Sequence, residues 1–143
     1  MSDTTQEKRM YAIQALDDVS SGFVQGAWEG KRFNGSAKRI DNYAAHKTYQ
    51  AEVMNKDSPH YIDKVGAGPL ESEDGANMIG SFLLVHSTRA EAEAFVANDP
   101  FTAAGTWSSV SIHRWQPMAS MKTVEVVKDG ADLTTIRCQT TDV

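Results

Sequence analysis

The stretch Ala94-Phe95-Val96-Ala97-Asn98-Asp99-Pro100-Phe101, followed by Thr102-Ala103-Ala104-Gly105-Thr106-Trp107, guides the interpretation of the whole chain. An apolar helical run ends at Asp99, because the residue before a proline is disfavoured in helical geometry. The Asp99 carboxylate is therefore presented on a bend, from which a small-residue turn leads to Trp107. Two interpretations are open: Asp99 only caps the short turn from Pro100 to Ala104, or it is a carboxylate placed for function.

The segments on either side of this stretch are predicted with clear signals. Thr88-Arg89-Ala90-Glu91 is a capping-box pattern that opens a helix, whose apolar stripe is Ala92, Phe95 and Val96. The run from Met78 to His86 is the most apolar strand and is expected to lie centrally in a sheet. Small residues at Gly80-Ser81 interrupt this strand, which usually marks a close contact or a bulge.

The N-terminal third combines a strand, a loop and a helix. Residues 9–16 alternate in polarity and predict a first strand. Residues 18–36 contain four glycines and three aromatics and are predicted to be a long loop, which either forms a binding lid or is only anchored to the core by its aromatic rings. Ser36 is the expected N-cap of a helix that runs to about Asn55. Its expected apolar positions are Ile40, Ala44, Ala51 and Met54.

A second face of the same predicted helix is centred on His46. Steps of three, four or seven residues place five side chains on that face, namely Arg39, Tyr43, Tyr49, Gln50 and Val53. After the break at Asp57-Ser58-Pro59, residues 60–70 predict a second strand that ends in Ala67-Gly68-Pro69-Leu70. Residues 71–77 form a polar turn, and Ser109 to Trp115 predicts a fourth strand.

The resulting order of elements, βαββαβ, predicts an α+β domain of the ferredoxin-like class over residues 1–116. In this arrangement a four-stranded antiparallel sheet carries both helices on one face. The other face is left bare, so a homodimer or a higher homo-oligomer is expected to cover it. Residues 117–143 are predicted to form a C-terminal β-hairpin with a turn at Lys128-Asp129-Gly130, which covers its own sheet edge or reaches a partner.

Composition excludes several classes of function. The chain has 143 residues, a net charge of -5 and no Lys/Arg cluster longer than a pair, which argues against a nucleic-acid surface. The N-terminal residues carry no signal-peptide pattern and the apolar runs are short, so a cytoplasmic protein without a membrane segment is expected. Cys138 is the single cysteine, which fits a reducing compartment.

Several of these features occur together in the order and spacing of a known family. The relevant residues are Ala45-His46, Ala67-Gly68-Pro69-Leu70, Gly80-Ser81, Glu91-Ala92, Asn98-Asp99-Pro100-Phe101, Ala104-Gly105 and Val110. Over residues 9–116 the chain resembles the YCII-related domain family. The resemblance implies a dimeric α/β barrel fold with an active-site histidine and aspartate, which map onto His46 and Asp99. Some members are similar in being cofactor-free dehydrochlorinases of chlorinated hydroxyquinols.

The sequence departs from the family in two places. Members often carry an arginine about three residues before the histidine, whereas Tyr43 stands there in this chain and the nearest arginine is Arg39. The loop before the first helix and the segment after Gln116 are both longer than the family pattern leads us to expect. These two segments are expected to change the shape of the pocket or the way the chains associate.

The predicted chemistry is proton transfer by His46 as general base, with Asp99 fixing its tautomer. The expected reaction is an elimination or an isomerisation of a small phenolic or enolic substrate, without a cofactor or a metal. Six residues are candidates for substrate binding, namely Arg39, Tyr43, Pro69, Ser81, Phe101 and Trp107. The alternative is a non-catalytic dimeric module that binds a small molecule or a partner protein in the same cleft.

Overall fold

The computed structural model describes residues 7–118, 122–129 and 133–140, with side chains over the first of these ranges. The elements in chain order are β1 (Arg9–Asp17), β2 (Val24–Trp28), β3 (Lys31–Gly35), α1 (Ala37–Glu52), β4 (Asp63–Glu71), β5 (Met78–Ser87), α2 (Arg89–Ala97), α3 (Pro100–Ala103), β6 (Trp107–Arg114), β7 (Lys122–Asp129) and β8 (Leu133–Thr140).

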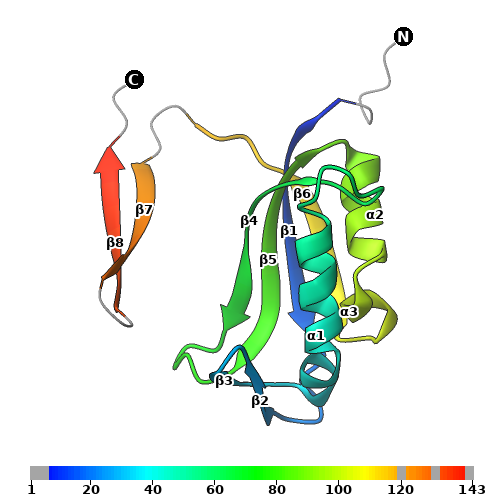
Figure 1. Cartoon of the computed structure of the whole chain (residues 1–143), viewed down its shortest axis with the longest axis vertical. Coiled ribbons are helices and arrows are strands. Elements are labelled where there is room, and N and C mark those ends of the chain that lie inside the picture. Colours follow the sequence, from blue (N-terminus) through cyan, green and yellow to red (C-terminus); the bar gives the residue numbers. More distant parts are fainter. Residues whose placement is uncertain (1–6, 119–121, 130–132, 141–143) are drawn as a thin grey trace.

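Four strands form one antiparallel sheet in the order β4-β5-β1-β6, and α1 and α2 lie on the same side of it (Figure 1). Without β2 and β3, the order of elements is the predicted ferredoxin-like βαββαβ, so the predicted fold is confirmed. β5 is an internal strand, as expected from its apolar sequence. Gly80 on β5 faces the backbone of β1, because a Cβ atom at this position would lie 2.3 Å from the Ala15 carbonyl oxygen.

The predicted loop over residues 18–36 is wrong in its central part, because β2 and β3 pair there as a short hairpin. The turn lies at Glu29 and Gly30, which both have positive φ angles of 49° and 80°. A two-residue turn of this kind is usually signalled by Asn-Gly or Asp-Gly, and glutamate in this conformation is uncommon. The hairpin is attached to the β4–β5 connection, because Asn34 bridges to Asn77 and donates a hydrogen bond to the Ala76 carbonyl.

The two helices pack onto the sheet through different side chains. The stripe predicted for α2, Ala92, Phe95 and Val96, is buried, and the Thr88 capping box is present. The stripe predicted for α1 is wrong, since Ala44, Ala51 and Met54 are exposed and Ile40 is only half-buried. The face of α1 that carries His46 is turned toward the sheet instead, and its buried residues are Arg39, His46, Tyr49 and Gln50. Polar groups on the sheet form hydrogen bonds with this face of α1. A search for apolar residues at helical spacing cannot detect a face that is buried through hydrogen bonds.

Several predicted element boundaries shift by a few residues. α1 ends at Glu52, three residues before the predicted end. β4 begins at Asp63, because residues 54–62 form turns after the helix rather than extended strand. β6 begins at Trp107, two residues earlier than predicted, where it pairs with Asp17 across a shift in register.

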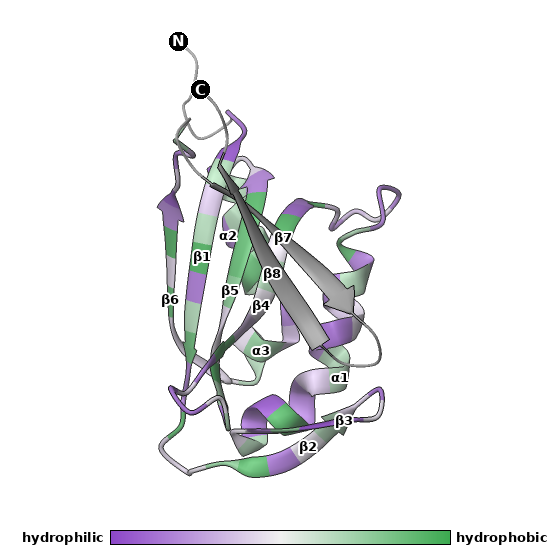
Figure 2. Cartoon of the chain, turned by 90° about the vertical axis from the view of Figure 1, so that its left-hand side faces the viewer, coloured by the Kyte–Doolittle hydropathy of each residue, from purple (hydrophilic) through white to green (hydrophobic). Residues whose placement is uncertain are grey.

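The opposite face of the sheet is partly apolar. Figure 2 views the sheet from the side away from the helices and shows apolar residues along β1 and β5. Leu16 and Phe82 lie on this face, opposite in register to Gly80 and Gln14, and are 42% and 40% exposed. Within the part of the chain that the structure describes, no helix combines the length and apolar character needed to cross a membrane.

β7 and β8 pair with each other in the predicted C-terminal hairpin, from Lys122 opposite Thr140 to Asp129 opposite Leu133. Gly130 of the predicted turn, like residues 1–6 at the N-terminus, lies outside the described residues.

Candidate functional site

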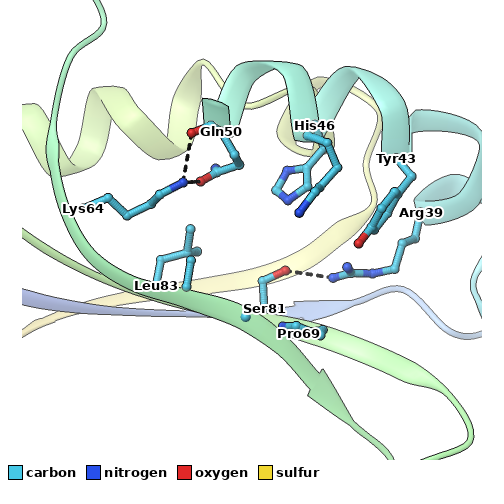
Figure 3. A pocket seen from close by; sticks show the side chains of 11 residues that line it. Arg39, Tyr43, His46, Gln50, Lys64, Pro69, Ser81 and Leu83 are labelled. Atoms are coloured by element: carbon cyan, nitrogen blue, oxygen red, sulfur yellow. Dashed lines mark hydrogen bonds between the residues drawn. The ribbon is translucent and has the colours of Figure 1, made fainter. Parts of the chain in front are cut away.

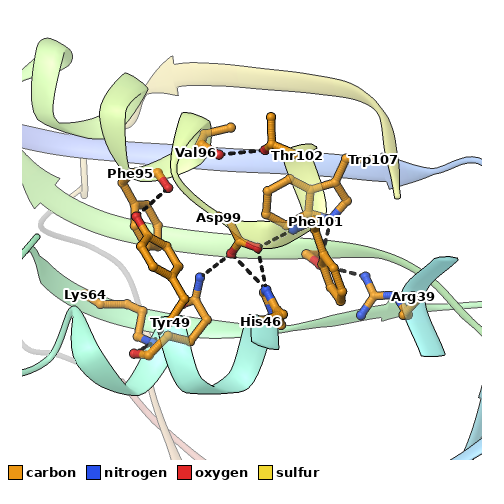
Figure 4. Close-up of polar contacts among 12 residues, drawn as sticks. Arg39, His46, Tyr49, Lys64, Phe95, Val96, Asp99, Phe101, Thr102 and Trp107 are labelled. Carbon is orange, nitrogen blue, oxygen red and sulfur yellow. Dashed lines mark hydrogen bonds and ion pairs between the residues drawn. The ribbon is translucent and has the colours of Figure 1, made fainter. Parts of the chain in front are cut away.

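His46 and Asp99 meet at the centre of the helix layer. α1 carries His46, and the bend between α2 and α3 carries Asp99. The His46 Nδ1 atom lies 2.9 Å from Asp99 Oδ1 and 2.8 Å from Oδ2 (Figure 4). The Asp99 side chain is 1% exposed, so the contact is screened from water. The capping interpretation is confirmed, because Asp99 Oδ1 accepts a hydrogen bond of 2.9 Å from the Phe101 N–H as the N-cap of α3, and the contact with His46 shows that the cap is not its sole interaction.

A third donor reaches the same carboxylate. The Gln50 Nε2 atom donates to Asp99 Oδ2 at 2.8 Å, while its Oε1 accepts from Lys64 Nζ at 2.9 Å. The Asp99 oxygens accept from the Gln50 amide and from the Phe101 N–H, and toward an acceptor carboxylate His46 Nδ1 is the donor in the third contact. The proton of a neutral His46 ring then resides on Nδ1, and Nε2 is left as an acceptor.

Two aromatic rings hold the imidazole from the other side. Phe101 stacks on His46 with 3.9 Å between ring centroids and 5° between the planes. Trp107 meets the imidazole edge-on at 6.0 Å. Both rings are buried, and neither is among the side chains that line the adjoining cavity. Phe101 and Trp107, expected from the sequence to contact substrate, therefore lie in positions that fix the histidine ring.

The cavity beside His46 has a volume of about 100 Å³ (Figure 3). Four of the predicted binding residues line it together with His46, namely Arg39, Tyr43, Pro69 and Ser81. Pro69 and Ser81 are register partners on β4 and β5 whose side chains face α1. The remaining lining residues are Lys47, Gln50, Lys64, Ala67, Gly68 and Leu83.

Arg39 is a structural cation in the wall of this cavity. Its Nε and one terminal nitrogen form a two-point ion pair with Asp17 at 2.6 and 3.2 Å, and both side chains are at most 2% exposed. The same terminal nitrogen donates to the Gly80 carbonyl and to Ser81 Oγ, each at 2.8 Å. Ser81 Oγ also accepts from Trp107 Nε1 at 3.3 Å. Since Ser81 Oγ accepts twice, its own proton is available to donate into the cavity.

Two further titratable groups line the cavity with altered pKa values. Burial lowers the pKa of Lys64, and the nearby positive charge of Lys47 lowers it further, while Asp99 acts in the opposite direction. Burial raises the pKa of Tyr43 above its ordinary value, against the smaller effect of Arg39. Tyr43 therefore keeps its hydroxyl proton at neutral pH, and the cavity wall offers several donors to an anionic oxygen.

Four residues of this arrangement were not among the binding residues expected from the sequence: Asp17, Lys47, Gln50 and Lys64. Gln50 was detectable, since it shares the helical face of His46. Asp17 directly follows the predicted first strand over residues 9–16, and its pairing with Arg39 depends on a contact across 22 residues. Within residues 7–118, no three side chains of the metal-ligating types come together.

Comparisons with known proteins identify the family and the fold of the chain. A family model for the YCII-related domain matches residues 25–116. Among solved structures, the chain is similar to 5-chloro-2-hydroxyhydroquinone dehydrochlorinase (TftG) from Burkholderia phenoliruptrix AC1100, in complex with 2,5-dihydroxybenzoquinone. The two share 28% sequence identity with a TM-score of 0.55, over 75% of this chain and 93% of the other. A search of curated proteins found no match. With the family model covering most of the chain and the fold agreeing, this protein belongs to the YCII-related domain family.

Proposed function

We propose that this protein is a small enzyme, independent of any cofactor, that performs acid–base chemistry with His46 and Asp99 on a small phenolic or enolic molecule. The buried contact between His46 Nδ1 and both Asp99 oxygens carries the proposal. His46 lines the cavity, and since Nδ1 is engaged by the carboxylate, Nε2 is the ring nitrogen that remains to act on a bound molecule. A histidine held in this way serves as a general base, and the carboxylate stabilises the imidazolium that forms.

The reaction consists of proton transfers and the loss of a leaving group. Nε2 removes the proton of a ring hydroxyl or an enol, and the O–H electron pair forms a carbonyl as the molecule tautomerises. If the imidazolium returns the proton to carbon, the result is an isomerisation. If the imidazolium instead returns the proton to the ring carbon that bears chlorine, loss of a second hydroxyl proton then expels chloride with its bonding electrons, and the net result is an elimination that releases a proton and a halide ion. Both routes balance without an oxidant or a reductant.

The shape of the cavity supports a small ring as the substrate. A volume of about 100 Å³ is of the order of the cavities that hold one benzene-sized molecule. Tyr43 and Ser81 supply hydroxyl donors, and Pro69 and Leu83 supply apolar surface. The similar solved structure is that of a dehydrochlorinase with a dihydroxybenzoquinone bound, which supports an elimination on a hydroxylated ring as the first reaction to test.

Turnover by the purified protein tests the proposal. The first probes are 5-chloro-2-hydroxyhydroquinone, followed by chloride release, and a panel of phenols and enols followed by deuterium exchange at carbon. His46→Ala should lower kcat/KM by about 10²- to 10⁴-fold, the usual contribution of a positioned base. His113→Ala, an exposed histidine on β6, is the matched control and should keep full activity. Full activity in His46→Ala would refute the assignment, and no turnover or exchange by the wild type would favour a binding module.

The tautomer of His46 provides a second test that needs no substrate. Nitrogen-15 chemical shifts of the imidazole should report a proton on Nδ1 in the wild type, because the Asp99 carboxylate accepts from that atom. Asp99→Asn keeps an oxygen for the α3 cap but loses the negative charge, so the two tautomers should mix. An unchanged tautomer in this variant would show that Asp99 does not orient the ring.

We also propose that the protein assembles as a homodimer through the open face of its sheet. Leu16 and Phe82 are exposed there, and covering such a face is the usual solution in small antiparallel domains. Phe82→Glu should shift the mass measured by light scattering from a dimer to a monomer. A wild-type protein that is already monomeric at micromolar concentration would contradict this part of the proposal.

A further inference from the structure

A second and larger cavity lies next to the one described above. It has a volume of about 500 Å³ and is lined by residues of the β2–β3 hairpin, α1 and the β4–β5 connection. Tyr43 and Lys47 line both cavities, so the two are adjoining compartments of one depression. Its lining residues are Gln25, Trp28, Lys31, Arg32, Phe33, Asn34, Tyr43, Lys47, Glu71, Gly75, Ala76, Asn77 and Met78.

This hairpin cavity has structured walls. The Tyr43 ring packs against Phe33 at 4.6 Å and against Trp28 at 5.8 Å between centroids, which joins the hairpin to α1. Gly26 lies directly against Ile40, because a Cβ atom at this glycine would approach the Ile40 Cδ1 atom to 2.6 Å. Asn34 joins the other side of the hairpin to the β4–β5 connection. Three separate segments therefore hold the aromatic and basic side chains around one space.

The charge of the hairpin cavity is opposite to that of the chain. Lys31, Arg32 and Lys47 line it with a single carboxylate, Glu71, although the whole chain has a net charge of -5. Among residues 7–118, none of these three cations lies within ion-pair distance of an Asp or Glu side chain, whereas Arg9, Lys38, Arg39 and Arg89 all do. Cations without carboxylate partners beside aromatic faces suit an anionic ligand with an apolar body.

We propose that the hairpin cavity binds an anionic arm, such as a carboxylate, on a ligand whose ring occupies the cavity at His46. This inference rests on the proposed function for the location of the ring, and it narrows the substrate class to small hydroxylated or enolic rings that carry a carboxylate substituent. Lys47 and Tyr43 stand at the junction of the two cavities, where the arm leaves the ring. Arg32 and Lys31 add positive charge within the hairpin cavity that attracts the arm, and Trp28 and Phe33 form its aromatic wall.

A matched pair of probes tests this proposal by binding alone. Hydroquinone supplies the bare ring, and 2,5-dihydroxyphenylacetate supplies the same ring with a carboxymethyl arm; their dissociation constants are measured by calorimetry. The wild type should bind the carboxylate probe about five- to tenfold more tightly, which is the range of one or two partly exposed charge pairs. Arg32→Met should remove most of this preference and leave the affinity for hydroquinone unchanged, because Arg32 lines only the hairpin cavity, and Lys47→Met should also remove most of the preference. Lys56→Met, which removes an exposed lysine outside both cavities, should keep the preference.

The indole signal of Trp28 locates the bound arm. In nitrogen-15 spectra it should shift with 2,5-dihydroxyphenylacetate and not with hydroquinone, and Trp28→Phe assigns the signal. Equal affinities for the two probes, a preference that survives both Met variants, or no shift of Trp28 at millimolar carboxylate probe would overturn the inference. Failure of the proposed function can be told apart from failure of this inference. The former appears as turnover that survives in His46→Ala, and the latter appears in binding measurements alone.

Discussion

α1 and α2 lie on the same face of one sheet, yet they bury different kinds of side chain (Figure 1). α2 packs with Ala92, Phe95 and Val96, and its stability follows from apolar area removed from water. α1 buries Arg39, His46 and Gln50 alongside Tyr49, and each of these polar groups has a partner on the sheet or at the α2–α3 bend. The α2 interface is mainly apolar packing. The α1 interface replaces part of that packing with a network of hydrogen bonds that borders the cavity.

The largest effect on the α1 interface is expected from Asp17→Ala. This change leaves the Arg39 guanidinium buried without its counter-charge, which should lower the free energy of unfolding by about 3 to 5 kcal/mol. Urea denaturation measures the difference. Asp18→Asn is the neighbouring control, since Asp18 pairs with Lys38 at the surface, and it should change the midpoint little. Equal effects of the two variants would show that burial of the Arg39–Asp17 pair is unimportant.

Phe95→Ala tests the α2 interface. Phe95 is 4% exposed, and its truncation should cost about 3 kcal/mol of stability through the cavity that it leaves. Because no cavity-lining side chain at His46 is removed, kcat/KM of the folded protein should be unchanged. The measurement combines denaturation with turnover, and Met54→Ala, 52% exposed on the chain after α1, serves as the control. A parallel loss of activity would mean that the two interfaces are not independent.

Gln50→Leu should affect stability and turnover together. The variant removes the hydrogen bond to Asp99 and the side-chain acceptor of Lys64, at a cost of about 1 to 3 kcal/mol. A looser Asp99 orients His46 less well, and we expect kcat/KM to fall about tenfold, as for an interaction of about 1.4 kcal/mol. Thr48→Val, an exposed change on the same helix, should leave both quantities unchanged. Loss of stability at full turnover would separate Gln50 from the dyad.

The smallest effect concerns pH and Lys64. Its pKa is lowered in the folded protein by burial and by Lys47, so the folded state binds the proton less tightly than the unfolded state does. The lowered pKa therefore reduces the free energy of unfolding at neutral pH. This reduction disappears as pH rises from the lowered pKa of Lys64 through 10.5, its ordinary value. The stability of the wild type relative to Lys64→Met should therefore increase over that interval in thermal denaturation. A difference that stays constant with pH would contradict the lowered pKa.

The elements with local signals were the ones that the sequence could predict. Local signals depend on neighbours within a few residues. Examples are the Thr88 capping box, the N-cap of α3 at Asp99 with Pro100 after it, and the alternating polarity of β1. The β2–β3 hairpin escaped prediction because Glu29 adopts a left-handed conformation that no local rule assigns to glutamate. The buried face of α1 was assigned to Ile40 and Met54 by hydrophobicity, since the counter-charge that makes Arg39 a core residue comes from a distant strand.

The candidate site was predictable to a similar extent. His46 and Asp99 were paired through the resemblance to the family, and the ferredoxin-like topology permits their contact because it brings α1 near the end of α2. Lys64 and Lys47 could not be placed at the cavity in advance. Their position depends on where α1 and β4 end up relative to each other, and an isolated lysine in a sequence resembles any surface lysine.

Asp99 caps α3 and also orients His46, so one carboxylate serves the backbone and the dyad at once. Most substitutions there would remove the cap of α3 and the hydrogen bond to His46 together. Asparagine is the substitution that preserves the cap and discards the charge. Under the proposed function, a relative with Asn at the position of Asp99 would keep the cap of α3 and lose the charge beside the histidine, which is what the binding-module alternative requires.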